Sequence, residues 1–253
     1  MRLGRLATQF TENQLRQVSL EDWSVMEVFG KQKEWTVNQL KILAGGFMNS
    51  NSVTAQALDA LHLATLGYAL CGLPAEGMAQ IQAGEFCSAV MYLGQLALQC
   101  AEPQLYALTR LCTRSGMFGP VSGWAEEVFL EMGSVAAGLD DLELSSLVLQ
   151  QIQGLTPLAV SLIQPTKFAV SFSAQQMAMF SWSQANVVTD QQKKLLDSKQ
   201  LEALMLALNE YGGSQIYKAG KSHADRCSQC ALLHLSVLIC MYVTRWGQSR
   251  PSP

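Results

Sequence analysis

A short motif that recurs every eight residues between positions 171 and 192 constrains the fold more than any other feature of the sequence. Ser173, Ser181 and Thr189 each follow an apolar residue and precede a glutamine by three positions. This is the pattern of a capping box, in which the hydroxyl accepts a hydrogen bond from a free helical N–H and the glutamine accepts one from the capping residue. The stretch predicts three successive helix starts. A single longer helix is the alternative, because eight residues make about 2.2 helical turns.

The same motif recurs elsewhere in the chain. Residues 10–18 (FTENQLRQV) and 35–43 (WTVNQLKIL) share it at an offset of 25 residues, and Asp197–Gln200 repeats it after Leu196. Glycine and proline interrupt the chain every eight to fifteen residues, and alternating β-branched runs are almost absent. The sequence therefore predicts an all-α fold, a right-handed superhelical solenoid of short helices of the armadillo or HEAT type. A compact all-α bundle is the alternative.

The pattern also predicts two regions. Residues 1–211 are expected to form the α-helical repeat domain, whose last helix, Ser198–Asn209, is stopped by Gly212 and Gly213. Residues 212–253 are expected to form a polar spacer followed by a short hydrophobic tail. The longest apolar run, Ala231–Val243, is too short to span a membrane.

The composition excludes some classes of protein. Only 15% of the 253 residues are charged, and the net charge of −3 is spread without a basic stripe, so nucleic acid is not an expected partner. The first residues contain no apolar run, so no signal peptide is expected. The seven cysteines suit either a reducing compartment or an extracellular protein with a spare thiol.

The C-terminal region contains two candidate motifs. Gly220-Lys221-Ser222 resembles the end of a phosphate-binding loop, but Gln215 stands where the motif needs glycine, so this reading is rejected. His223, Cys227, Cys230 and His234 supply four ligand types that suit tetrahedral zinc. Structural zinc sites usually draw their ligand pairs from separate elements, so a tail with incidental cysteines is preferred and no metal site is assigned.

The remaining histidine and acidic candidates are expected to have structural rather than catalytic roles. His62 lies in an apolar stretch and is expected to be a satisfied, partly buried histidine. Asp140, Asp141 and Glu143 are expected to favour a helix N-terminus, rather than to act as paired catalytic carboxylates. No catalytic or cofactor-binding residues are assigned, and the protein is not expected to be an enzyme. Four of the five tryptophans are expected to lie in the core: Trp23, Trp35, Trp124 and Trp182.

Residues 58–111 contain a more specific combination of features: Leu58-Asp59, Gly67-Tyr68, Cys71, Leu73-Pro74-Ala75-Glu76, Cys100 and Pro103-Gln104-Leu105. In this order they resemble a segment of the mesothelin, stereocilin and otoancorin family, and the general texture of the chain leans toward the otoancorin branch. The short-helix rhythm of residues 154–165 adds to the resemblance, which covers most of residues 19–209.

The resemblance implies a large extracellular protein of superhelical helical repeats on the apical cell surface, acting in adhesion. Members of the stereocilin and otoancorin branches serve attachments of inner-ear cells to an acellular gel. The resemblance carries a disulfide between Cys71 and Cys100 and no catalytic residues. Cys87 and Cys112 are expected to form a second, less securely assigned bridge.

Some features of this sequence differ from those of the family, and they concern where the protein is located. Because no signal peptide is expected, the chain is interpreted as a fragment or short isoform of a longer precursor. No N-x-Ser/Thr sequon occurs, although members of this family are glycoproteins. Small residues at 212–214 or 219–220, a polar spacer and the apolar run resemble a GPI-anchor signal, but ten polar residues follow the run.

We therefore expect a non-enzymatic extracellular adhesion protein that links the apical cell surface to an acellular matrix or gel and binds matrix or cell-surface macromolecules without a cofactor. The alternative is an intracellular α-helical scaffold that binds partner peptides. A metal-dependent function of the tail is a third, less favoured possibility.

Overall fold

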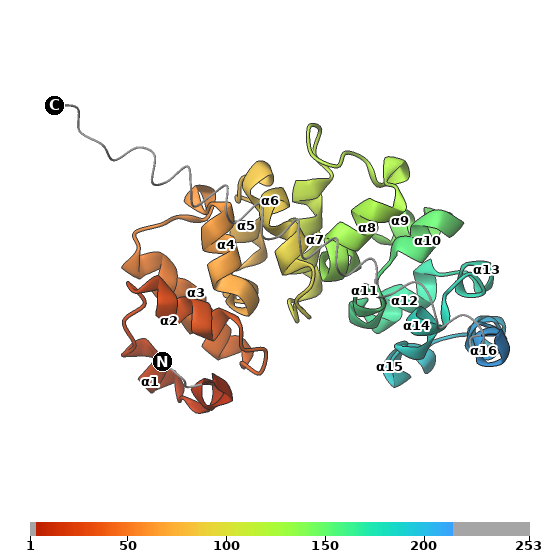
Figure 1. Cartoon of the computed structure of the whole chain (residues 1–253), viewed down its shortest axis with the longest axis horizontal. Coiled ribbons are helices and arrows are strands. Elements are labelled where there is room, and N and C mark those ends of the chain that lie inside the picture. The colour runs from red at the N-terminus through yellow and green to blue at the C-terminus, as the bar shows by residue number, and fades with distance from the viewer. Residues whose placement is uncertain (1–3, 215–253) are drawn as a thin grey trace. The chain divides into compact units, whose positions relative to one another are not determined.

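The computed structural model describes residues 4–214 of the chain, and no strand occurs among them. The all-α prediction is confirmed. Sixteen α-helices follow one another along this part of the chain (Figure 1): α1 (Glu12–Arg16), α2 (Trp23–Gly30), α3 (Val37–Ser50), α4 (Ala60–Leu66), α5 (Ala75–Met78), α6 (Ala83–Leu93), α7 (Glu102–Cys112), α8 (Glu126–Met132), α9 (Asp141–Ser146), α10 (Leu149–Gly154), α11 (Pro157–Leu162), α12 (Pro165–Ser171), α13 (Ala174–Met177), α14 (Trp182–Asn186), α15 (Asp190–Lys193) and α16 (Ser198–Ser214).

Five 3₁₀ helices lie between them: η1 (Gly4–Gln9), η2 (Ala55–Ala57), η3 (Gly67–Gly72), η4 (Val121–Gly123) and η5 (Gly133–Gly138). Apart from α3 and α16, the α-helices have eleven residues or fewer, as the spacing of glycine and proline predicts. The chain divides into two compact units, Met1–Leu208 and Asn209–Pro253, and of the second only the end of α16 is described. Apart from the end of α16, all structural features below belong to the first unit.

The three helix starts predicted between 171 and 192 are confirmed. Helices α13, α14 and α15 begin directly after Ser173, Ser181 and Thr189, and each capping residue has an extended backbone. Each hydroxyl accepts a hydrogen bond from the glutamine N–H three residues on, at 3.2–3.3 Å. The single long helix is therefore wrong for this stretch. The boxes predicted at Thr11, Thr36 and Asp197 also form.

The glutamines of these boxes do more than cap their own helices. The Gln192 side chain is fully buried, and its Oε1 accepts from the Thr189 N–H at 2.8 Å. Its Nε2 donates to the carbonyl oxygens of Val160 at 2.9 Å and Ile163 at 2.8 Å. Ile163 is the C-cap of α11. One side chain thus joins the start of α15 to the end of a helix about thirty residues earlier. We call this arrangement the glutamine clamp.

Seven glutamines form this clamp. In each, Oε1 accepts from the residue three before it, and Nε2 donates to carbonyl oxygens at the end of an earlier helix, 27 to 33 residues back: Gln39, Gln104, Gln151, Gln176, Gln184, Gln192 and Gln200. Helix ends leave carbonyl groups without helical partners, and the clamps satisfy them. All but one of these glutamines are fully or nearly buried.

The apolar residues around the clamps form the core. Phe172 is both the C-cap of α12 and the residue before the cap of α13, and it lies in a ring cluster with Phe168 and Phe180 at centroid distances of 5.1 and 5.4 Å. Val188 is buried in the equivalent place before the cap of α15. The apolar position of the motif therefore buries the junction between successive helices, while the glutamine ties that junction to an earlier one.

Two close backbone crossings depend on glycine. Gly133 ends α8 with φ of +50°, and a Cβ atom there would lie 2.2 Å from the Gly94 carbonyl oxygen. Gly67 ends α4 with the same φ, and its Cβ would lie 2.3 Å from the Gly30 carbonyl oxygen. Positive φ and this closeness exclude a larger side chain at both positions. The same crossing therefore occurs twice, with corresponding glycines 64 and 66 residues apart.

Two expectations fail in detail. The last helix runs to Ser214, through Gly212 and Gly213, because glycine in a helix costs only about 1 kcal/mol and does not by itself end it. Trp182 is 46% exposed rather than buried. It is the first residue of α14, directly after the cap, and lies outside the apolar positions that face the core. Trp35 and Trp124 are buried and Trp23 is half-buried.

Two glutamines share the same local motif, but only one of them forms a clamp. Substituting each by alanine should therefore lower the free energy of unfolding by different amounts. Gln192→Ala should lower the free energy of unfolding by about 3–5 kcal/mol, because the four hydrogen bonds of the side chain are lost and two buried carbonyls are left unpaired. The measurement is denaturant unfolding followed by circular dichroism.

Gln14→Ala is the matched control. Gln14 caps α1 in the same way but is exposed and makes no clamp to an earlier helix. Its loss should cost less than about 1 kcal/mol. Equal losses for the two variants would contradict the clamp.

The glycine crossing gives a second pair of variants. Gly133→Ala should destabilise the protein by at least about 3 kcal/mol, because alanine disfavours positive φ and its Cβ would strike the Gly94 carbonyl. Gly45→Ala, in the interior of α3 with open space around the Cβ position, should instead stabilise it by about 0.5–1 kcal/mol. Thermal unfolding of both variants checks the pair, and a Gly133→Ala protein as stable as the wild type would refute the crossing.

Candidate interaction surface

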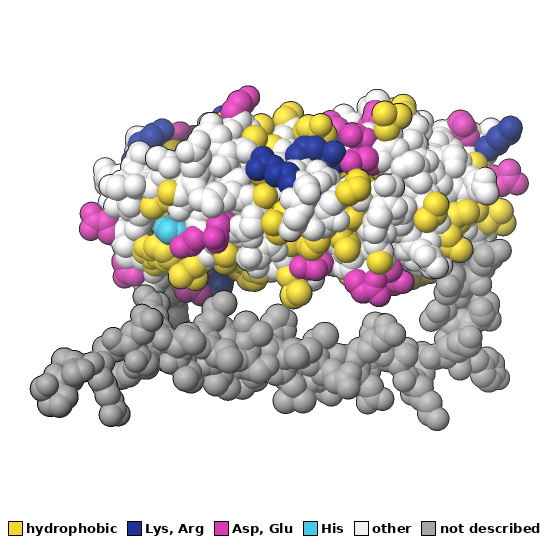
Figure 2. All heavy atoms as spheres, turned by 90° about the horizontal axis from the view of Figure 1, so that it is seen from above, with side chains coloured by type: hydrophobic (Ala, Val, Ile, Leu, Met, Phe, Trp, Pro, Cys, Tyr) yellow, Lys and Arg dark blue, Asp and Glu magenta, His cyan; other side chains and the backbone are white. Residues whose placement is uncertain are grey.

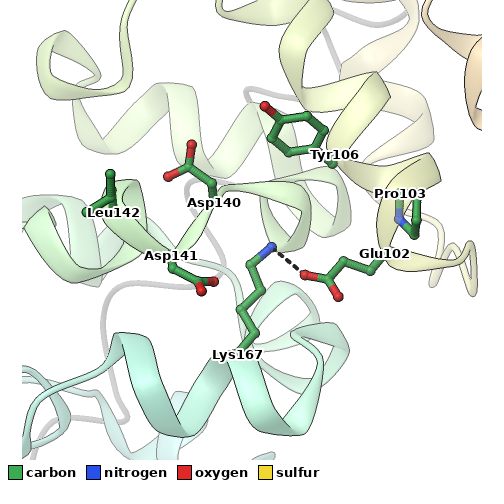
Figure 3. Close-up of a pocket in the computed structure, with 7 residues that line it drawn as sticks. All are labelled: Glu102, Pro103, Tyr106, Asp140, Asp141, Leu142 and Lys167. Atoms are coloured by element: carbon green, nitrogen blue, oxygen red, sulfur yellow. Dashed lines mark ion pairs between the residues drawn. The ribbon is translucent and has the colours of Figure 1, made fainter.

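Two hollows in the described part of the chain share Leu142 in their lining. The first hollow, about 540 Å³, is shown in Figure 3. Glu102, Pro103 and Tyr106 come from α7 on one side, Asp140, Asp141 and Leu142 from the start of α9 on the other, and Lys167 rises from α12. The second hollow, about 720 Å³, is lined by Leu142 and by Arg110, Pro120, Val121, Glu143 and neighbouring polar residues. We call the two together the Leu142 groove.

Leu142 lines both hollows and is 81% exposed. It follows directly from how α9 begins. Asp140 caps the helix by accepting from the Glu143 N–H at 2.8 Å, so the following residues form the first turn. Leu144 is buried in the core, and Leu142 therefore lies on the outer side of the helix. Together with Tyr106, which is half-exposed, it gives the groove an apolar surface.

Two ion pairs fix the walls of the groove. Lys167 is 5% exposed, and its Nζ lies 3.1 Å from Glu102 Oε1, which joins α12 to α7. Arg110 of α7 donates through Nη2 to both carboxylate oxygens of Glu143, the first at 2.7 Å. The Arg110 guanidinium also lies 5.1 Å from the centre of the Tyr106 ring. The two basic side chains of the groove are thus each paired with a carboxylate of another element.

The remaining charge of the groove is negative. Because Lys167 and Arg110 are paired with Glu102 and Glu143, the carboxylates of Asp140 and Asp141 are left uncompensated. The predicted role of Asp140, Asp141 and Glu143 at a helix N-terminus is confirmed, since Asp140 is the N-cap of α9 and the other two lie in its first turn. A partner with basic and apolar groups would complement this surface.

The four cysteines of the described residues lie in or beside η3, α6 and α7. Cys71 in η3 and Cys100, just before α7, form a disulfide with a Cα–Cα distance of 4.7 Å. Cys87 in α6 and Cys112 at the end of α7 are not bonded, but their Sγ atoms lie 2.8 Å apart. The hydrogen bond from Cys112 lowers the pKa of the Cys87 thiol. The same bond, together with burial, raises the pKa of Cys112.

His62 is a satisfied, partly buried histidine, as predicted. Its Nδ1 lies 2.7 Å from Asp59 Oδ1, and its ring packs on Trp23 at 4.6 Å and Phe47 at 6.0 Å. Burial acts to raise the pKa of Asp59, but the hydrogen bonds from His62 outweigh it and lower that pKa. His62 is thus the residue three positions after the N-cap Asp59 in a capping box at the start of α4, the position that glutamine occupies in the other boxes described above.

Several expectations concern residues outside the described part. These are the zinc candidates His223, Cys227, Cys230 and His234, and the spacer and apolar run of the GPI-like signal. Within residues 4–214, no cluster of three or more histidine, cysteine or acidic side chains is arranged to hold a metal ion. Across the same range, none of the helices combines the length and apolar character needed to span a bilayer. On the face in Figure 2, basic side chains form separate small groups.

The sequence predicted neither the Leu142 groove nor the clamps formed by Gln104 and Gln151. The Leu142 groove has no sequence motif, since Leu142 looks like any apolar residue of an amphipathic helix. The clamps of Gln104 and Gln151 follow alanine and valine, respectively, instead of a hydroxyl residue, so the search for Ser/Thr-x-x-Gln did not find them. A search for glutamine four residues after an apolar residue at a helix start would have identified the Gln151 clamp.

Comparison with known proteins shows related sequences over most of the chain. Stereocilin of Homo sapiens is 41% identical over 224 residues, which are 88% of this chain and 13% of stereocilin. Stereocilin of Mus musculus is 40% identical over 210 residues, 83% of this chain and 12% of that protein. Otoancorin of Homo sapiens is 30% identical over 207 residues, 82% of this chain and 18% of otoancorin. No family model and no solved structure matches the chain.

The chain therefore spans less than a fifth of the length of these relatives. The predicted family is confirmed, and within it the identity to these stereocilins, 40–41%, is higher than the identity to the otoancorins, 29–30%. On this similarity, which extends over more than four-fifths of its length, the chain belongs to the stereocilin and otoancorin family.

Proposed function

We propose that this chain is a non-enzymatic extracellular adhesion module that helps to attach the apical cell surface to an acellular matrix or gel of the inner-ear type. The observation that carries the proposal is the Leu142 groove, an open surface in which an exposed leucine lines both hollows while the basic groups Arg110 and Lys167 are already paired. Such a surface suits contact with a macromolecule. Membership of the stereocilin and otoancorin family supports this class of function.

The helices are proposed to form a right-handed α-solenoid. In solenoids each repeat packs only against its neighbours, and stability is approximately a sum of repeat and interface terms. The clamps support this form, because each of the seven joins helix ends 27 to 33 residues apart. The twice-used glycine crossing supports it as well. Such a framework would hold the walls of the groove at a fixed spacing.

The extracellular location is supported by the disulfide between Cys71 and Cys100, since structural disulfides persist in oxidising compartments. The rival function is an intracellular scaffold that binds partner peptides. A free thiol at both Cys71 and Cys100 in protein isolated without reductant would favour that rival. GPI anchoring concerns the tail beyond the described residues, and release of the protein from cells by phospholipase would test it.

The experiment tests binding with the full chain coupled to beads and fragments of the acellular gel of the inner ear as the probe. Leu142→Asp should reduce the bound fraction at least about fivefold, because it places a charge at the centre of the apolar contact and adds to the two uncompensated carboxylates. The fold should be unaffected, since the side chain is 81% exposed.

Leu195→Asp is the matched control, because Leu195 is also exposed, at 51%, and does not line the groove. It should bind like the wild type. Wild-type beads that fail to bind the gel would contradict the adhesive function. Binding that Leu142→Asp leaves unchanged would instead contradict only the assignment to the Leu142 groove.

A further inference from the structure

We propose that Cys87 and Cys112 form a second disulfide. The loop that it closes overlaps in sequence with the loop closed by Cys71 and Cys100, and the bond attaches the C-terminal end of α7 to α6. Cys87 lies in the middle of α6, Cys112 is the last residue of α7, and their Sγ atoms are 2.8 Å apart. A disulfide needs a separation of about 2.05 Å, so the two sulfur atoms must approach by less than 1 Å. Helices α6 and α7 pack directly on one another, which keeps the pair in place.

The other described cysteines are already used. Cys71 and Cys100 are bonded to each other, so Cys87 and Cys112 are the only free thiols in the part of the chain that the structure describes. The first bridge also implies surroundings in which a second pair of adjacent thiols would be oxidised. Neither thiol has another hydrogen-bonding role, and the pair does not belong to the Leu142 groove.

The exposure of the two thiols suits a stepwise reaction with a small disulfide oxidant such as oxidised glutathione. Cys87 is partly exposed and Cys112 is buried. The Cys87 thiolate attacks one sulfur of the oxidant, forms a mixed disulfide and releases one glutathione thiol. Cys112 then loses its proton and attacks the Cys87 sulfur, which releases the second glutathione. Two protein thiols are oxidised to one disulfide and one glutathione disulfide is reduced to two thiols.

The consequence is that α7 would be held covalently at both ends. Cys100 precedes the first residue of α7 by two positions and is bonded to η3, while Cys112 would join the last turn to α6. Helix α7 provides Glu102, Tyr106 and Arg110 to the Leu142 groove and Gln104 to a clamp. The second bridge would therefore fix the wall of the groove against separation from α6.

Peptide mapping tests the bridge in the full chain, secreted from mammalian cells behind an added cleavable leader and alkylated with N-ethylmaleimide before digestion. Cleavage with cyanogen bromide and trypsin places the four cysteines in four separate peptides: residues 49–78, 79–91, 92–110 and 111–114. Without reduction, mass spectrometry should find residues 49–78 joined to 92–110 and residues 79–91 joined to 111–114. Digestion follows denaturation, so the result does not depend on how stable a variant is.

Cys87→Ser provides the control for pairing. It should release residues 111–114 from their link to 79–91, with an alkylated Cys112 in place of the disulfide, and leave the pair formed by Cys71 and Cys100 intact. Recovery of wild-type residues 79–91 and 111–114 as separate alkylated peptides would overturn the proposal. So would any other partner for Cys87 or Cys112, including a cysteine of the tail.

Discussion

The hydrogen bonds made by the side-chain amide of each clamping glutamine are the interaction on which the rest of the structure depends. A helix of four to seven residues leaves most of its N–H and C=O groups without helical partners, and burying such groups unpaired costs about 1–3 kcal/mol each. A glutamine amide has one acceptor oxygen and two donor hydrogens. In Gln192 the oxygen serves the start of α15 and the hydrogens serve the end of α11. One side chain thus forms hydrogen bonds to backbone groups at the ends of two short helices, which allows both ends to be buried in the core.

The same interaction explains how the short helices of residues 4–214, among which no strand occurs, are held to one another. The partners of each clamp are about thirty residues apart, so a clamp fixes the register between a helix and an earlier one in addition to satisfying backbone groups. The apolar residue before each cap buries the junction. Gly67 and Gly133 allow the closest backbone approaches. Disulfide and ion pairs then join α7 to its neighbours, and the Leu142 groove lies on the framework that results.

The sequence predicts the local part of this design and misses its long-range part. The box at Ser173, Ser181 and Thr189 depends on residues three apart, so it can be recognised from a single stretch. The carbonyl partners of Gln192 lie 29 and 32 residues earlier and bear no side-chain signature, since any residue has a carbonyl. Gln104 and Gln151 clamp without a hydroxyl at the cap. Leu142 could not be told from a core leucine, because its exposure depends on where α9 meets α7 and α12.

The most direct test of the clamp is the hydrogen-exchange rate of glutamine side-chain amides, measured by NMR on protein labelled with ¹⁵N. The amide protons of Gln184 and Gln192 are buried and bonded to two carbonyls each, and should exchange on the order of 100-fold more slowly than those of exposed Gln14. Exchange of Gln184 and Gln192 at the rate of Gln14 would contradict the account, because it would mean that water reaches these amides and that the helix ends are not joined through them.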